Sequence, residues 1–242
     1  MTYAVLSSKA PVGCIDALRE AGFTPLVLPP FERLQSPVDT HADMLLFSYK
    51  NEMIVEEEYY KTAKDIFDTL ARDCALTLTL ARDNVNKEYP HDVALNAVCL
   101  SDAVFSKSKY TSKKISELAE ARQLRMLNVN QGYAACSTLV LSDRAVICAD
   151  PSLTAEYEKN GIDVCRISNG SVSLPPYDCG FIGGACGVYG ESVYFAGNID
   201  LHSDADKIKS VIASLKMKCV SLSQEPLCDV GGIKFFESQS ID

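Results

Sequence analysis

The sequence repeats one order of secondary structure, and this repeat limits the folds that the chain can adopt. Residues 135–168 contain two apolar stretches joined by a Ser142-Asp143 turn, a helical stretch at 152–160 that ends at Gly161, and a third apolar stretch at 164–167. A glycine in the left-handed conformation satisfies the last carbonyls of a helix, so Gly161 is a typical helix stop. The predicted unit is therefore strand, strand, helix, strand.

Three other segments predict the same order of elements. They cover residues 43–80, 95–129 and 181–222, with turns at 50–51, 101–102 and 189–190 and helices at 57–72, 111–122 and 204–215. The triplet Leu-Ser-Asp stands at the same place in two units, at 100–102 and 141–143. The units begin roughly 40 to 50 residues apart, which is typical of propeller-like repeats.

The two ends of the chain complete a fifth unit. Residues 4–28 copy the strand, helix, glycine and strand of 145–167 but lack a first strand, and residues 229–237 are a strand without a partner. Joining the ends predicts one α/β domain over residues 1–242, with five ββαβ modules around a pseudo-fivefold axis, helices outside and no exposed sheet edge. A generic α/β sheet is the alternative, but it leaves the split unit unexplained. Residues 238–242 are expected to be a frayed tail.

Composition excludes several classes of protein. The 242 residues include 23 basic and 32 acidic side chains, a net charge of −9 that argues against nucleic-acid binding. No stretch approaches the ~20 apolar residues of a membrane span, and no signal peptide is recognised, so we expect no membrane partner. The ten cysteines form no CxxC pair and mostly lie in apolar runs, which indicates reduced, buried thiols and a cytoplasmic protein.

The sequence predicts neither a metal nor a cofactor. It contains three histidines, no cysteine pair, no P-loop and no GxGxxG at a strand–helix turn. We expect His91 to be exposed in a Pro-bounded loop and His202 to be structural, beside a helix start. The expected partner is a small molecule, and the oligomeric state is left open.

The split five-unit repeat resembles the pentein fold of the guanidino-group-modifying enzymes, which include arginine deiminase, dimethylargininase and the amidinotransferases. The chain is more closely similar to an uncharacterised bacterial family assigned to that fold. The stretches that carry this resemblance are YPHDVALN (89–96), QGYAACS (131–137), GFIGGA (180–185) and PLCDVGGI (226–233). In those enzymes a Cys thiolate attacks the guanidinium carbon, a His shuttles protons, and carboxylates hold the cation. The resemblance implies a site where the first strands of the modules meet the axis.

Three residues at such strand starts are the candidate catalytic set: Cys136, His41 and Asp43. A strand would place His41 and Asp43 on one face, where the carboxylate could orient the imidazole ring. Cys136 follows Gly132 at another strand start and is the candidate nucleophile. The alternative for each is structural: a buried thiol, a loop histidine and a turn-capping aspartate.

Six further residues are candidate ligand contacts: Asp229, Asn96, Gly183, Gly184, Gly231 and Gly232. Asp229 could bind a cation, and Asn96 is a polar residue in an apolar strand, which needs hydrogen-bond partners. Glycine pairs within a strand indicate close approach to a ligand or to another backbone. Relief of crowding at a narrow axis explains them equally well.

One position departs from the enzymes of this fold. They carry their cysteine in the last blade as Gly-Gly-x-x-Cys, whereas residues 231–235 here end in Phe235. Cys228 lies three residues before the glycines and is expected to point elsewhere, and His41 lies in the first blade rather than in a middle one.

Two functions therefore stay open. The preferred one is a protein that binds a small ligand, such as a guanidino or amidino compound, in an axial pocket without the standard catalytic Cys. The alternative is a Cys-dependent hydrolase or amidinotransferase acting on a guanidino compound. The alternative predicts that Cys136 is reactive, with a depressed pKa.

Overall fold

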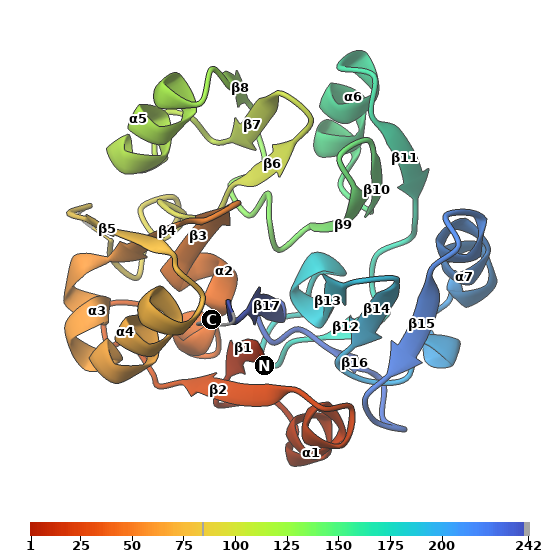
Figure 1. Ribbon diagram of the computed structural model, residues 1–242. Coiled ribbons are helices and arrows are strands. Elements are labelled where there is room, and N and C mark those ends of the chain that lie inside the picture. Colours follow the sequence, from red (N-terminus) through yellow and green to blue (C-terminus); the bar gives the residue numbers. More distant parts are fainter. Residues whose placement is uncertain (84, 240–242) are drawn as a thin grey trace.

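Five three-stranded sheets form most of the computed structural model, which describes residues 1–83 and 85–239. Figure 1 shows the sheets set around a common centre, with the longer helices on the outside. In each sheet the central strand pairs antiparallel with one neighbour and parallel with the other, and the parallel partner follows a crossover helix. The predicted repeat of strand, strand, helix and strand is present in all five.

Four modules are continuous in sequence. The first has β3 (Leu46–Tyr49), β4 (Glu52–Glu56), α3 (Glu57–Thr62), α4 (Lys64–Asp73) and β5 (Thr77–Ala81). The second has β6 (Val98–Leu100), β7 (Ala103–Ser106), α5 (Lys113–Ala121) and β8 (Arg125–Asn128). The third has β9 (Thr138–Ser142), β10 (Ala145–Cys148), α6 (Pro151–Lys159) and β11 (Asp163–Arg166). The fourth has β13 (Cys186–Tyr189), β14 (Ser192–Phe195), η3 (Ile199–Leu201), α7 (Ala205–Ser214) and β15 (Lys218–Ser221).

The fifth module is built from both ends of the chain. It contains β1 (Thr2–Ser7), α1 (Val12–Glu20), β2 (Thr24–Leu28) and β17 (Lys234–Glu237). β17 pairs antiparallel with β1, with Tyr3 opposite Phe236, as the split repeat predicted. Ser238 and Gln239 donate backbone hydrogen bonds to the carbonyls of Met1 and Asp73. These two residues of the expected tail are therefore held, and residues 240–242 lie outside the described part.

Three parts of the sequence prediction are wrong in detail. The helix expected at 57–72 is two helices that meet at Ala63. The strand expected at 229–237 begins only at Lys234, because Gly231 and Gly232 have φ of 72° and 77° and turn the chain. The sheets are separate, so each keeps two edge strands, since pairing of the chain ends completes one sheet and does not join the others.

The remaining elements lie near the centre. They are η1 (Val38–Thr40), α2 (Ala42–Leu45), η2 (Gly183–Ala185), and a two-stranded parallel sheet of β12 (Val172–Ser173) and β16 (Leu227–Cys228). The expected strand start at His41 and Asp43 is thus a helical turn, and the glycine pair expected inside a strand lies in a 3-10 turn.

A left-handed residue follows the main helix of every module and leads the chain into the parallel strand. These residues are Gly22 (φ 89°), Ala75 (φ 49°), Gln123 (φ 56°), Gly161 (φ 75°) and Lys216 (φ 59°). Helices commonly end in this conformation, which glycine adopts without the Cβ penalty. The left-handed backbone conformation is therefore repeated in every module, even where the residue type differs.

Buried hydrophobic side chains lie between each sheet and its helices and between neighbouring modules. One cluster joins Cys14 and Leu18 of α1 to Ala196, Leu222 and Ile233 near the last modules. The core of the described residues is thus divided into five clusters, and each cluster joins two neighbouring modules. Among residues 1–83 and 85–239, no helix is both long enough and apolar enough to cross a membrane.

Gly22→Ala should lower the free energy of unfolding by about 1–2 kcal/mol, because alanine pays the left-handed penalty there. A Cβ at this position meets no atom within 4 Å, so the loss is conformational rather than steric. Gly13→Ala is the matched control: it lies inside α1, also in open space, and should cost nothing and gain up to about 1 kcal/mol. Urea denaturation of both variants measures the difference. Equal effects would contradict the assignment.

Candidate functional site

Five polar side chains from separate parts of the chain meet at the centre of the molecule. They are His41, Asp43, Asn96, Cys136 and Asp229, and none is more than 3 % exposed. Asn96 connects them: its Nδ2 donates to the Cys136 Sγ at 3.0 Å and to the Asp43 carbonyl at 3.1 Å, and its Oδ1 accepts from the Ala135 N–H at 2.7 Å. The His41 Nδ1 lies 3.7 Å from an Asp229 oxygen. We call these five side chains the central layer.

The backbone around Gly184 holds the central layer in place. The Gly184 N–H donates to the Cys136 carbonyl at 2.9 Å, and its carbonyl accepts from the N–H groups of Val230 and Gly232, both at 2.8 Å. The Asp43 N–H in turn donates to the Gly231 carbonyl at 3.0 Å. Three distant segments are therefore fixed to one another by main-chain hydrogen bonds.

Asp229 is a buried carboxylate held by backbone donors. Its Oδ2 accepts from the Phe181 N–H at 2.9 Å and its Oδ1 from the Gly231 N–H at 3.0 Å. Burial raises its pKa to about 6, and the negative charge of Asp43 acts in the same direction, whereas His41 and the two N–H groups oppose the rise. Asp229 therefore changes charge close to neutral pH.

Cys136 is a neutral thiol in this environment. Burial raises its pKa well above the ordinary value, and the negative charges of Asp43 and Asp229 raise it further, whereas the hydrogen bond from Asn96 lowers it. The depressed pKa expected of a reactive Cys136 is thus wrong for the unliganded protein, because burial and two nearby carboxylates disfavour the thiolate.

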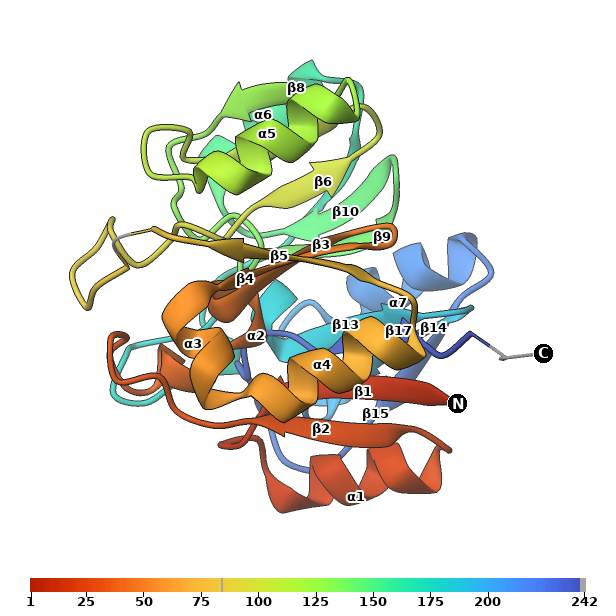
Figure 2. The same ribbon diagram turned by 60° about the vertical axis from the view of Figure 1, so that its left-hand side comes forward.

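One cavity, of about 330 Å³, opens on one side of the central layer. His41, Cys136 and Asp229 line it, and aromatic side chains form much of its wall: Tyr89, Tyr133, Tyr177 and Phe181. The connections that supply this wall gather on the left of Figure 2, away from the chain ends. We call this the aromatic cavity.

The aromatic wall is ordered by ring contacts and one strong hydrogen bond. The Tyr133 ring lies 5.4 Å from that of Tyr89 and 6.0 Å from that of Phe181, measured between centroids. The Tyr133 hydroxyl donates to the Asp92 Oδ2 at 2.6 Å, while the buried Asp92 Oδ1 has no partner among the described residues. Burial raises the pKa of Asp92. This cavity thus combines two carboxylates with aromatic faces.

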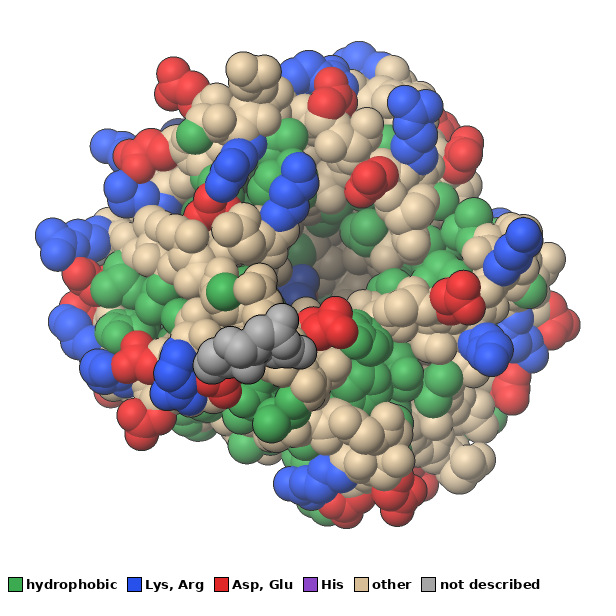
Figure 3. Space-filling model, viewed as in Figure 1, with side chains coloured by type: hydrophobic (Ala, Val, Ile, Leu, Met, Phe, Trp, Pro, Cys, Tyr) green, Lys and Arg blue, Asp and Glu red, His purple; other side chains and the backbone are tan. Residues whose placement is uncertain are grey.

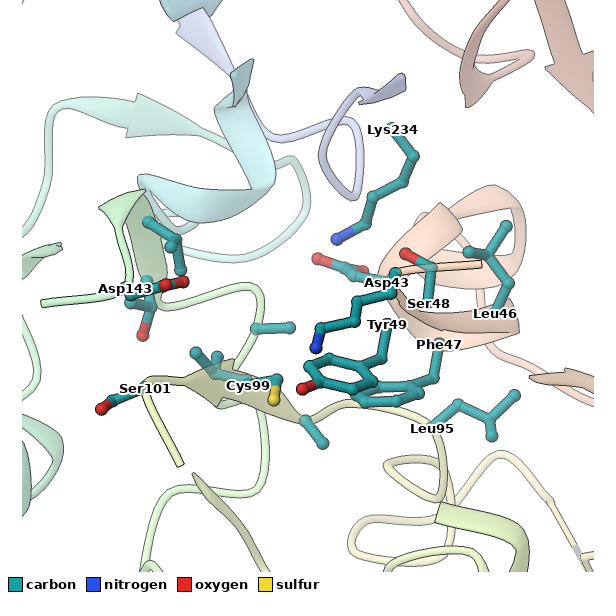
Figure 4. Close-up of a pocket in the computed structure, with 16 residues that line it drawn as sticks. Asp43, Leu46, Phe47, Ser48, Tyr49, Leu95, Cys99, Ser101, Asp143 and Lys234 are labelled. Carbon is teal, nitrogen blue, oxygen red and sulfur yellow. The ribbon is translucent and has the colours of Figure 1, made fainter. Parts of the chain in front are cut away.

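A second cavity, of about 440 Å³, lies on the opposite side of the central layer and is the hollow at the centre of Figure 3. Figure 4 shows Asp43 and Lys234 pointing toward one another inside it, near Ser48 and Tyr49. We call this the lysine cavity. A smaller neighbouring cavity shares Asp43 and Lys234 and adds Gly183 and Gly232 to its lining.

The predicted site residues are thus brought together but divided between two cavities. His41 and Asp43 face opposite sides because they do not share a strand: His41 is the extended residue before α2, whereas Asp43 lies within that helical turn. Asn96 is between the cavities and lines neither. Two of the glycines, Gly184 and Gly231, make room for Asp229 and His41 respectively.

The aromatic wall and Asp92 were not predicted as site residues. They lie in connections between modules, where no hydrophobic period marks a residue as facing inward. Except for Tyr177, the available signal was their clustering directly before the first strands, in the stretches 89–96, 131–137 and 180–185. Of the other histidines, His91 is exposed, and His202 is buried with its Nδ1 accepting from the Asp204 N–H at 3.0 Å.

Comparison with known proteins identifies the family. Residues 5–234 match a family of unknown function, DUF6873. The chain belongs to this family. A search of curated proteins found no match.

Three solved enzyme structures superimpose on this chain. The DUF6873 chain superimposes on a mutant DDAH from Pseudomonas aeruginosa complexed with citrulline (13 % identity, 91 % of each chain, TM-score 0.55). It also superimposes on agmatine deiminase from C. jejuni (8 % identity, 98 % of this chain and 94 % of that one, TM-score 0.59). A third is SxtG, an amidinotransferase from Microseira wollei (9 % identity, 94 % and 78 %, TM-score 0.53). At these identities the likeness shows the pentein fold alone.

Two residues of the last module have structural contacts in this family member. Phe235 packs against the rings of Phe23, Tyr194 and Tyr189, with centroids 4.8, 5.3 and 5.5 Å away. Cys228 packs against the cluster that contains Cys14, outside both the aromatic and the lysine cavity. Cys228 therefore points elsewhere, as the sequence predicted.

Asp229→Asn should change the pH dependence of stability. The folded-state pKa of about 6 lies above the ordinary 3.8, so the native state binds the extra proton and stability falls as pH rises through this window. Between about pH 4 and pH 7 the wild type should lose up to ~3 kcal/mol relative to the variant. Urea denaturation across this range measures the difference. A constant difference between the two proteins would contradict the assigned shift.

Gly184→Ala should disrupt the central layer, because a Cβ there would lie 1.9 Å from the Asp229 Oδ1 and 2.4 Å from its Cγ. We expect a loss of about 1–3 kcal/mol from overpacking. The same Gly13→Ala variant is the control for a glycine in open space. A stable Gly184→Ala protein with wild-type Asp229 titration would show that this contact does not position the carboxylate.

Proposed function

We propose that this DUF6873 protein binds a small amidinium-type cation, such as a guanidino or amidino compound, in the aromatic cavity, without turnover at Cys136. The observation that carries the proposal is the pair of buried carboxylates, Asp92 and Asp229, facing a cavity walled by aromatic rings. A cation with planar N–H groups gains charge-assisted hydrogen bonds from carboxylates and attraction from ring faces.

The contacts leave acceptor capacity for such a ligand. The buried Asp92 Oδ1 has no partner among the described residues, and each Asp229 oxygen accepts only one backbone N–H. The descriptions of the fold relatives, a DDAH, an agmatine deiminase and an amidinotransferase, support the same ligand class by analogy. The cavity volume suits a small ligand.

Binding without turnover is favoured by the state of the thiol and by Phe235. Cys136 is buried between carboxylates that keep it protonated, and the position that holds the cysteine in the Gly-Gly-x-x-Cys pattern is occupied by a packed aromatic ring. The second candidate is a Cys-dependent hydrolase or amidinotransferase. It is favoured by one observation: Cys136 and His41 line the same cavity.

Two further proposals concern the arrangement of the five modules and the cellular compartment of the protein. We propose that the five modules act as a five-bladed propeller whose axis passes through the central layer, with one cavity at each end. The ten free cysteines support a reducing compartment such as the cytoplasm.

Acetamidinium and methylguanidinium should raise the melting temperature of the protein, because a ligand that prefers the folded state stabilises it. Asp229→Asn should weaken binding about tenfold or more, since a charged hydrogen-bond partner is lost. Asp163→Asn is the matched control, because this exposed carboxylate lies outside the aromatic cavity. Equal shifts in the two variants would contradict the proposal.

The two functions are separated by labelling with 2-chloroacetamidine, followed by intact mass. Slow labelling that is unchanged in Cys136→Ala and Cys228→Ala supports binding without catalysis. Fast single labelling that is lost only in Cys136→Ala would support the enzyme, and an assay for deiminase or amidinotransferase activity would follow.

A further inference from the structure

The lysine cavity contains a buried carboxylate, Asp43, that lacks a charged partner among the described residues. Both Asp43 oxygens are buried, and neither has a hydrogen-bond partner among the described residues. Asp43 itself is only 2 % exposed, yet it lines this cavity. Burying an ionised carboxylate is costly unless it is paired, so this carboxylate indicates a missing partner.

Lys234 supplies the opposite charge in the same cavity. It is half-buried, and Figure 4 shows its side chain directed at Asp43. It belongs to no ion pair within residues 1–83 and 85–239, so its ammonium group lies more than 4.0 Å from the Asp43 oxygens. The two groups therefore face the same cavity without forming a direct ion pair.

The rim of the cavity also has one positively and one negatively charged side chain. Lys50 and Asp143 are both exposed there and carry one charge of each sign. A simple anion or a simple cation would therefore meet one unfavourable charge inside the cavity. A small molecule that carries both charges would pair with both.

We propose that the lysine cavity is a second binding site, separate from the aromatic cavity, for a small zwitterion. The cationic nitrogen of the ligand binds Asp43, and its anionic oxygens bind Lys234. The cavity has the volume of a small-molecule site, and Ser48 and Tyr49 on its wall offer further hydrogen bonds. This site does not depend on the proposed function of the aromatic cavity, because Asp229 does not line it.

Glycine, β-alanine and 4-aminobutanoate are the probes, each compared with acetate and ethylammonium, which carry one charge apiece. At about 10 mM, at least one zwitterion should raise the melting temperature and give a saturation-transfer NMR signal, while the single-charge compounds give much less. Asp43→Asn and Lys234→Met should each weaken zwitterion binding about tenfold or more.

Two controls separate this site from its surroundings. Lys113→Gln, at an exposed lysine of α5 outside the lysine cavity, should leave the affinity within about twofold. Asp229→Asn should leave zwitterion binding unchanged while it weakens amidinium binding, so failure of either site is visible by itself. The proposal is wrong if no zwitterion binds better than acetate and ethylammonium, or if Asp43→Asn and Lys234→Met both bind as the wild type does. Should Asp43→Asn fold poorly, Lys234→Met gives the same answer.

Discussion

The main-chain hydrogen bonds of Gly184 are the interaction on which the centre of this molecule depends. They connect the segment before β9 to the turn before β17. The Gly231 carbonyl of that turn also accepts a hydrogen bond from the Asp43 N–H. Segments next to sheets that share no strand are therefore joined at the centre of the molecule by main-chain hydrogen bonds. Because a Cβ at Gly184 would strike Asp229, the same position sets both the spacing of the modules and the place of the buried carboxylate.

The central layer separates two environments with different charge. On one side, Asp92 and Asp229 face aromatic rings, and on the other Asp43 faces Lys234. Asn96 donates hydrogen bonds to the Cys136 thiol and to the Asp43 carbonyl. These bonds connect the two sides of the layer and hold the thiol in place. The high pKa of that thiol follows directly, since burial and both carboxylates disfavour the thiolate. The layer therefore keeps Cys136 as a neutral thiol in the unliganded protein.

Much of the fold could be predicted from the sequence because the modules repeat. Apolar strands, a hairpin turn and a helix stop recur in the same order, so weak local signals support one another across units. The helix stop at Gly161 is visible as a glycine, but Gln123 and Lys216 take the same left-handed conformation without a sign in the sequence. In those units the order of elements, rather than the residue type, allowed the prediction.

The candidate site was predictable in its location but not in its geometry. Polar residues at strand starts do meet at the centre, yet His41 and Asp43 diverge because a helical turn begins between them at Ala42 instead of the expected strand. The aromatic wall escaped prediction because the connections that carry it have no hydrophobic period. Likewise, Lys234 was visible only as part of the run in which Phe235 replaces a cysteine, and its place inside a cavity follows from the pairing of β17 with β1.

Because β17 pairs with β1, the architecture does not require the chain ends to lie in this particular module. Each of the other three-stranded sheets is formed by a continuous segment, and the fifth differs only in being interrupted between strands that lie side by side. A circular permutant that joins the present ends by a short linker and opens instead at the Lys50–Asn51 hairpin would retain every strand pairing described above. The strand pairings therefore depend on the cyclic order of the modules and not on which module contains the two chain ends.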